Sequence, residues 1–264
     1  MAEHTSTSFV EAAPKPRIGQ EPVGRRLVDL PWWFIGIVVV VLWAWVGILA
    51  TPNFNEAFQW IKVGIATTLV TSIIAYVLAI VLGLLTGLGR MSHNVVIRNV
   101  ARMYVELIRG IPMLVLIFFI AFVLFSGREN VPMLARAIIA LAVTYGAFLA
   151  EVFRAGIQSI GRGQMEAARS LGMRYGQAMR HIILPQAIRN VLPALGNDFV
   201  SMVKDSSLVS VLAVRDMTQI ARLYAGSTFR FPEAYVTLAV LYLTITVALS
   251  MAVAAYERRL RRHE

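Results

Sequence analysis

Long, uninterrupted apolar stretches constrain this chain more than any other feature of its sequence. A helix needs about 20 mostly apolar residues to cross the hydrocarbon layer of a membrane, where lipid cannot satisfy exposed backbone N–H and C=O groups. Four stretches meet that requirement, so an all-α, polytopic membrane helical bundle is the predicted fold class. They are Pro31 to Ala50, Val63 to Leu88, Pro132 to Ala150 and Ala234 to Tyr256.

Two further spans bring the predicted total to about six. Gly110 to Ser126 is short but almost purely apolar. Leu195 to Val214 carries Asp198, Lys204 and Asp205, and each charge near the middle of a span costs about 2.5–3.5 kcal/mol. Topology favours this span nevertheless, because six crossings from a cytoplasmic N-terminus return the arginine-rich C-terminus to the cytoplasm, where basic residues are favoured.

Composition supports the membrane assignment and excludes several classes of function. The mean hydropathy is +0.67, and 58% of the residues are hydrophobic while only 15% are charged. This composition is too apolar for a soluble protein with one core, because its surface would need more polar side chains. The chain has no cysteine, so disulfides, thiolate metal sites and cysteine nucleophiles are excluded. Its four histidines show no metal-ligand spacing. We therefore expect no catalytic, cofactor-binding or metal-binding residues.

The net charge of +10 is explained by the orientation of the chain in the membrane and not by nucleic-acid binding, because cytoplasmic loops of membrane proteins are rich in Lys and Arg.

The predicted organisation has four parts. Residues 1–30 are a disordered cytoplasmic tail and residues 31–50 an extra N-terminal transmembrane helix. Residues 61–256 form the main transmembrane domain, with a long cytoplasmic loop over residues 154–195, and residues 257–264 form a basic cytoplasmic tail.

The cytoplasmic loop contains a helix-turn-helix pattern. A helix-compatible run from Gln164 to Leu171 is followed by Gly172, and a second run, Tyr175 to Ile183, is followed by Pro185. Glycine favours the left-handed conformation that ends many helices, and proline cannot continue the hydrogen-bond ladder of the helix before it. Two interpretations are open for this loop: a docking element for another protein, or an amphipathic helix resting on anionic lipid.

The same loop resembles the EAA loop of ABC-importer permeases. The pattern is Glu-Ala-Ala, three residues, Gly, nine residues and Ile-x-Leu-Pro, and every fixed position is filled. Further segments resemble the polar amino acid branch of this family, among them residues 106–112, 150–157 and 204–210. The N-terminal helix departs from the family, whose members often have five spans. The residues that carry the loop motif are Glu166, Ala167, Ala168, Gly172, Ile182, Leu184 and Pro185.

This resemblance implies the fold of a type I ABC importer transmembrane domain in a bacterial cytoplasmic (inner) membrane, with the loop coupled to a dimeric cytoplasmic ATPase. It implies two further protein partners, a second permease subunit, identical or similar, and an extracytoplasmic solute-binding protein. ATP and Mg would be used by the ATPase, because the run from Gly156 to Arg162 lacks the Lys-Ser/Thr of a phosphate-binding loop. The implied function is import of a small polar solute, most simply an amino acid, by alternating access. The expected partners include membrane lipid and exclude nucleic acid.

Ionisable residues within spans are the candidates for a solute path, since they normally face the bundle interior or water. Glu151 could meet an ammonium group and Lys204 a carboxylate. A structural interpretation is also open, with a Glu151–Arg154 pair at the membrane edge and a buried network of Lys204 and Asp205. The candidate set is Tyr145, Glu151, Lys204, Asp205, Ser206 and Ser207.

An ion-coupled secondary transporter or channel that uses the intramembrane charges is the alternative function. Such a protein has no need for the EAA-type loop, and the sequence shows no internal repeat that would suggest two inverted halves.

Overall fold

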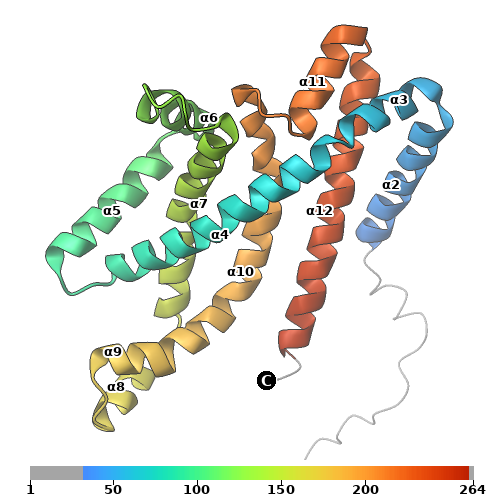
Figure 1. The fold of residues 1–264 in the computed structure, drawn as a ribbon. Coiled ribbons are helices and arrows are strands. Elements are labelled where there is room, and N and C mark those ends of the chain that lie inside the picture. Colours follow the sequence, from blue (N-terminus) through green and yellow to red (C-terminus); the bar gives the residue numbers. More distant parts are fainter. Residues whose placement is uncertain (1–31, 262–264) are drawn as a thin grey trace, which may run out of the picture. The chain divides into compact units, whose positions relative to one another are not determined.

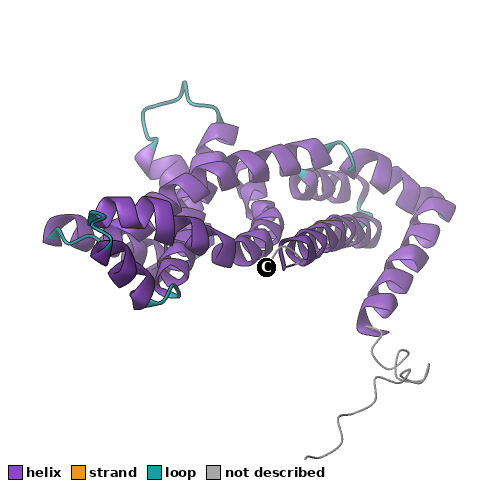
Figure 2. Ribbon diagram, turned by 90° about the horizontal axis from the view of Figure 1, so that it is seen from below, coloured by secondary structure: helices purple, strands orange, loops and turns teal. Residues whose placement is uncertain are grey.

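The computed structural model describes residues 32–261, so the predicted tail over residues 1–30 and the last three residues of the chain lie outside the described range. All regular secondary structure in the described part is helical (Figure 2). The chain divides into two compact units after Val40. Residues 32–40 contribute the first part of helix α2 (Trp32–Ala50), and the rest of the description concerns residues 41–261.

Three helical segments of the described part are long and apolar enough to cross a membrane. The first, Pro52–Arg90, combines α3 (Pro52–Ile61) with α4 (Gly64–Arg90). The others are α7 (Met133–Gln158) and most of α12 (Phe231–Arg261). These three helices lie where the sequence predicts spans, and the apolar part of α2 coincides with a fourth prediction.

The segment between the predicted spans that end at Leu88 and begin at Gly110 forms helix α5 (Val95–Gly110). It is followed by α6 (Met113–Phe118) and the π-helix η1 (Phe119–Leu124). The chain bends by 111° between α5 and the segment that α6 and η1 form together, and the two sides of this bend are apolar enough to make one broken span. Asn94 caps α5, because its side-chain oxygen accepts hydrogen bonds from the backbone N–H of Val96 (2.9 Å) and Ile97 (3.3 Å). Because charged residues occupy one face of α5, its apolar residues do not form a continuous run in the sequence, and the search for apolar runs did not find this helix.

The predicted span over residues 195–214 covers only part of the observed element. Helix α10 (Leu184–Asp205) begins 11 residues earlier and continues into the 3₁₀ helix η3 (Ser206–Leu212). A turn at Ala213, whose φ is 57°, leads into α11 (Met217–Thr228). Figure 1 places α8 (Arg162–Ser170) and α9 (Tyr175–Ala178) at one end of the helices, called here the α8 end, and α11 at the opposite α11 end.

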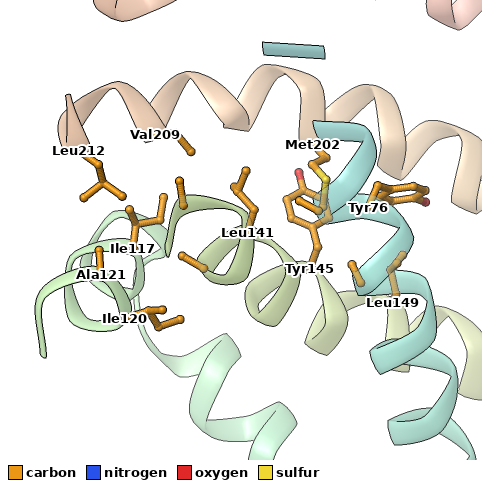
Figure 3. Packing of buried hydrophobic residues seen from close by; sticks show 14 of the residues in the cluster. Tyr76, Ile117, Ile120, Ala121, Leu141, Tyr145, Leu149, Met202, Val209 and Leu212 are labelled. Atoms are coloured by element: carbon orange, nitrogen blue, oxygen red, sulfur yellow. The ribbon is translucent and has the colours of Figure 1, made fainter. Parts of the chain in front are cut away.

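Helix α7 is the centre of the core. It packs against α4 at glycines: a Cβ atom on Gly83 would lie 2.6 Å from the Cβ of Leu149, and one on Gly146 would lie 2.8 Å from Leu82 Cδ2. Around it, Figure 3 shows buried residues from α4, α6, η1, η3 and α10, including Tyr76, Ile117, Met202 and Leu212. Small residues at this contact let the two backbones approach closely.

Candidate functional site

The EAA-type motif forms a compact helical turn at the α8 end. Helix α8 (Arg162–Ser170) occupies the region predicted for the first helix. It ends in a Schellman motif: Gly172 N–H donates to Arg169 O (3.0 Å) and Met173 N–H to Ala168 O (3.1 Å). Gly172 has φ = 83°, a conformation that costs residues with a Cβ about 1–2 kcal/mol. The predicted turn at this glycine is therefore confirmed.

The predicted helix end at Pro185 is wrong. After α9 (Tyr175–Ala178) the chain forms a π-helical turn, η2 (Met179–Ile183), and then continues directly as α10. Pro185 lies in the first turn of α10, where its missing N–H costs nothing. The wider π turn just before it spares the clash that a proline ring makes with an α-helical carbonyl, and the Gln186 side-chain amide donates to Ile182 O (2.8 Å).

A small apolar cluster fastens this turn to the long helices. Its buried members are Ile157 on α7, Ile183 in η2 and Ala187 on α10. Met165 of α8 packs against them, as do Ile182 and Leu184 of the motif. Nearby, the rings of His93 and Tyr175 make an edge contact with centroids 5.2 Å apart, which ties the α4–α5 turn to α9. A displacement of α8 would therefore act on α7 and α10 together.

The motif residues differ in their exposure. Glu166, Ala167, Gly172 and Pro185 are exposed, so another protein can reach them. Ala168 is 4% exposed and packs within the chain, so only one alanine of the pair is open to an external surface. Leu171, between them and Gly172, is 84% exposed, so its side chain is open to an external surface as well.

The candidate solute residues fall at the seam between α7 and α10. Tyr145 donates a hydrogen bond to Asp205 Oδ2 at 2.7 Å. Ser206 is buried and donates to Val203 O (2.7 Å), and Ser207 is half-buried. Lys204 is exposed, so the interpretation of a buried network between Lys204 and Asp205 is wrong: Asp205 bonds a tyrosine of α7, and Lys204 points away from the core.

Glu151 belongs to an ionic cluster near the α8 end. Its carboxylate pairs with Arg154 (2.8 Å), with Arg90 at the end of α4 and, at 3.7 Å, with Arg109 of α5. The Glu151–Arg154 pair predicted by the structural interpretation is present. The two other arginines come from helices that the sequence did not place beside Glu151, so this carboxylate joins three helices.

Two residues with notable environments were not among the candidates. Asp198 lies seven residues before Asp205 and so on the same face of α10; its Oδ2 atom is buried without a hydrogen-bond partner in the described part of the chain. Arg136 is buried, and its guanidinium donates to the carbonyls of Ala121 (2.9 Å), Arg128 (2.8 Å) and Val131 (3.1 Å). The seven-residue spacing of the two aspartates could have placed Asp198 beside Asp205. No sequence pattern predicts that one guanidinium donates to three backbone carbonyls.

These features define the class of protein first: a multi-pass, all-α membrane protein whose helical turn at one end is joined to its long helices. The family follows from comparison. Residues 79–262 match the family described as the binding-protein-dependent transport system inner membrane component, and the chain belongs to that family. Membership does not favour the ion-coupled alternative.

Named relatives and solved structures agree. The chain is 45% identical over 159 residues to the probable glutamine ABC transporter permease protein GlnM of Bacillus subtilis, covering 60% of this chain and 74% of the relative. It is 35% identical over 178 residues to the glutamine transport system permease protein GlnP of Escherichia coli K12, covering 66% and 81%. A crystal structure of an amino acid ABC transporter with histidines matches with a TM-score of 0.72 and 39% identity, covering 80% of this chain and 98% of the other.

A structure of the MetNI methionine ABC transporter matches with a TM-score of 0.67, covering 78% of this chain and 98% of the other. Its 22% identity supports the fold alone. The fold is thus that of a type I ABC importer transmembrane domain, as the sequence predicted.

Proposed function

We propose that this chain is the permease subunit of an ATP-driven importer that moves an amino acid across the cytoplasmic membrane by alternating access. The observation that carries the proposal is the coupling turn: an exposed α8 with a glycine-encoded reversal, fastened to α7 and α10. The names of the relatives, which refer to glutamine and amino acids, support the class of solute.

The assembly that this function requires has three other kinds of subunit. A dimeric cytoplasmic ATPase, which uses ATP and Mg, would dock on α8 at Glu166, Ala167 and Leu171. A second permease, identical or similar, would complete the membrane part, and an extracytoplasmic binding protein would deliver solute at the α11 end. In this orientation the α8 end and both termini are cytoplasmic.

The arrangement suggests how movement passes from the ATPase to the solute. α8 shares the cluster around Ile157, Ile183 and Ala187 with α7 and α10. Gly156 on α7 also faces Val191 on α10 so closely that a Cβ on the glycine would lie 2.0 Å from the valine Cγ1. Because the packed helices cannot slide freely there, α8 would tilt α7 and α10 as a pair.

At the other end of that pair lies the proposed solute region, with Tyr145, Asp205, Ser206 and Ser207 at the seam and Lys204 beside it. The Tyr145–Asp205 hydrogen bond also links the two helices, so a tilt of the pair would carry this region with it. Glu151 is assigned a different role, since Arg90 and Arg154 already pair with its carboxylate.

The test compares two glycine-to-alanine variants, Gly172→Ala and Gly176→Ala. Both glycines have open space where a Cβ would be, but only Gly172 has a positive φ. Gly172→Ala should strain the turn by about 1–2 kcal/mol and weaken retention of the ATPase when the complex is purified in mild detergent. Gly176→Ala lies in α9 and should retain it.

Amino acid-dependent ATP hydrolysis by the reconstituted complex provides the second readout. Gly172→Ala should lower the stimulation by solute-loaded binding protein, and Gly176→Ala should leave it unchanged. If the unsubstituted chain purifies as an intact bundle without any ATPase and moves solute under an ion gradient, the proposal is wrong.

A further inference from the structure

A cavity of about 550 Å³ lies between α3, α4 and α11, three helices that meet at the α11 end (Figure 1). Its walls consist of one cationic side chain, two uncharged polar side chains, a tryptophan and three aliphatic side chains. None of the described residues that line it is acidic. We call this site the α11 cavity.

Contacts between the three helices fix the walls of the α11 cavity. Where α4 begins, a Cβ on Gly64 would lie 2.5 Å from the backbone nitrogen of Met217, and the same N–H donates to Thr68 Oγ1 (3.2 Å). On α3, the ring of Trp60 lies 6.2 Å between centroids from the buried ring of Tyr224 on α11. The cavity is therefore formed without a ligand, as binding sites usually are.

Two cations stand at the α11 cavity. Arg215 lines it, is exposed, and makes no hydrogen bond or ion pair within the part of the chain that the structure describes. Gln59 also lines the cavity, and its side-chain oxygen accepts a hydrogen bond from the ammonium group of Lys62. An anion that entered would meet the guanidinium directly and the ammonium group beside it.

The carboxylates of the adjoining helices do not compete for these cations. Glu56, the acidic residue of α3, is already paired with Arg230 at 2.7 Å. Asp216, at the start of α11, is 2% exposed and does not line the cavity; its Oδ1 caps the helix by accepting from Gln219 N–H. The field in the cavity is therefore positive.

An exposed apolar stripe continues from the cavity along α4. Val63 and Thr67 line the cavity, and at spacings of three and four residues the same face continues through Val70, Ile74 and Val77. These last three side chains are 50%, 44% and 56% exposed. From Thr67 to Val77 the helix rises by about 15 Å, which is about half of the hydrocarbon thickness of a bilayer. The stripe thus has the length of an acyl chain in one leaflet.

We propose that the α11 cavity binds an anionic phospholipid. The phosphodiester lies against Arg215 with Lys62 nearby, the glycerol region beside Trp60, and an acyl chain along the α4 stripe. Tryptophan is enriched at the level of lipid headgroups, and basic residues near the membrane surface attract negatively charged lipids. A free anion would leave the apolar stripe uncovered, and a zwitterionic lipid would bring a further cation to a site that already holds two.

The bound lipid has a structural consequence. Because its site is shared by α3, α4 and α11, the lipid holds α11 against the start of α4 and should raise the unfolding temperature of the protein. The inference goes beyond the proposed function, since it depends neither on the identity of the solute nor on an ATPase.

Native mass spectrometry of the full-length chain in mild detergent measures the binding. The protein is titrated with phosphatidylglycerol and, separately, with phosphatidylcholine that has the same acyl chains. Phosphatidylglycerol should bind at least about fivefold more tightly, because it meets basic residues without bringing a cation of its own. Arg215→Gln should lower this preference by about fivefold. Lys62→Gln should lower it less, since Lys62 reaches the cavity only through Gln59.

Arg128→Gln is the matched control, because it removes an exposed cation from the loop before α7, outside the cavity. It should keep the preference of the parent. Arg215 is exposed and unpaired within the described chain, so Arg215→Gln should fold with the unfolding temperature of the parent when no lipid is added. Phosphatidylglycerol should then stabilise the parent and Arg128→Gln, and should stabilise Arg215→Gln less.

Inorganic phosphate separates a lipid site from a site for free anions. In large molar excess it should neither displace phosphatidylglycerol nor raise the unfolding temperature. Displacement by phosphate would assign the cavity to a soluble anion, and equal binding of the two lipids would assign it to another occupant such as a docked protein. Either result, or an unchanged lipid preference in both Arg215→Gln and Lys62→Gln, would overturn the inference.

Discussion

Glu151 illustrates how a membrane carboxylate can serve structure. Its side chain is 23% exposed and that of its partner Arg90 is 11% exposed, so removal of the negative charge leaves a poorly solvated guanidinium. Glu151→Gln should lower the free energy of unfolding by about 1–3 kcal/mol while the KM for solute stays nearly unchanged. Thermal unfolding in detergent and uptake kinetics measure the two quantities.

The competing role makes the opposite prediction. If Glu151 held the ammonium group of the solute, Glu151→Gln would raise KM and leave the unfolding temperature unchanged. A double-mutant cycle with Arg154→Met adds a check, since residues in one ionic cluster should show a coupling energy of at least about 0.5 kcal/mol.

Asp216 gives the protein a pH-dependent stability. It lies outside the membrane-spanning segments, and its Oδ1 accepts a hydrogen bond from Gln219 N–H (2.8 Å) at the start of α11. Burial raises the pKa of Asp216 to about 6, above the value of about 3.9 expected in the unfolded chain. The folded state thus binds a proton more tightly, and stability should fall by on the order of 2 kcal/mol as pH rises from about 4 to above 6.

Unfolding temperatures of the purified protein at pH 4.5 and 7.5 test this statement. Asp216→Asn keeps an oxygen that can cap α11 and removes the titrating group, so its unfolding temperature should vary less with pH. Glu129→Gln, which changes an exposed carboxylate, is the matched control and should keep the pH dependence of the parent. The same pH dependence in Asp216→Asn and the parent would contradict the assignment.

Among the helices, the contact between α4 and α7 depends on the absence of side chains. A Cβ on Gly83 would meet Leu149 Cβ at 2.6 Å, which is backbone-proximal and cannot move aside. Gly83→Ala should therefore force the two helices apart and destabilise the protein by about 1–3 kcal/mol. The unfolding temperature in detergent is the measurement.

Gly47→Ala is the control for this change. Gly47 also lies within a helix, but nothing lies within 4 Å of its added Cβ, so the gain in helix propensity should leave stability equal or higher. An equal loss of stability in both variants would show that helix propensity, and not the α4–α7 contact, determines the result.

Several segments of the bundle depart from regular α-helical geometry. The bend before α6, the π turns η1 and η2 and the 3₁₀ helix η3 interrupt regular hydrogen bonding in this membrane protein. Such backbone is tolerated at membrane depth where it is buried in protein or borders a cavity. Arg136 satisfies one of these segments by donating to Ala121 O of η1.

For the whole molecule, the proposed orientation places both termini and the α8 end in the cytoplasm. A fluorescent protein that matures only in the cytoplasm should therefore fluoresce when fused after the last residue. Asn130→Cys, in the exposed hairpin before α7, should react with an impermeant thiol reagent added to intact cells. Arg174→Cys, between α8 and α9, should react only after the membrane is permeabilised. The reverse labelling would invert the orientation.

Local features of the candidate site could be predicted from sequence because adjacent residues create them. Gly172 ends α8 through its own backbone conformation, and the apolar runs specify α4, α7 and α12 because hydrocarbon selects composition directly. Pro185 misled the prediction, since the consequence of a proline depends on whether the preceding turn can widen. The exposure of Ala167 and the burial of Ala168 also required the packed structure.

By itself, then, the sequence determined the all-α membrane class, the position of the turn at Gly172 and the resemblance to importer permeases. The tertiary structure decided the partners: Arg90 lies 61 residues from Glu151, and Asp205 lies 60 residues from Tyr145. It also decided that Lys204 is exposed and that Arg109 of α5 lies against Phe148 of α7. Hydropathy and turn chemistry act over a few neighbouring residues, whereas these contacts depend on the register and crossing of helices that only packing fixes.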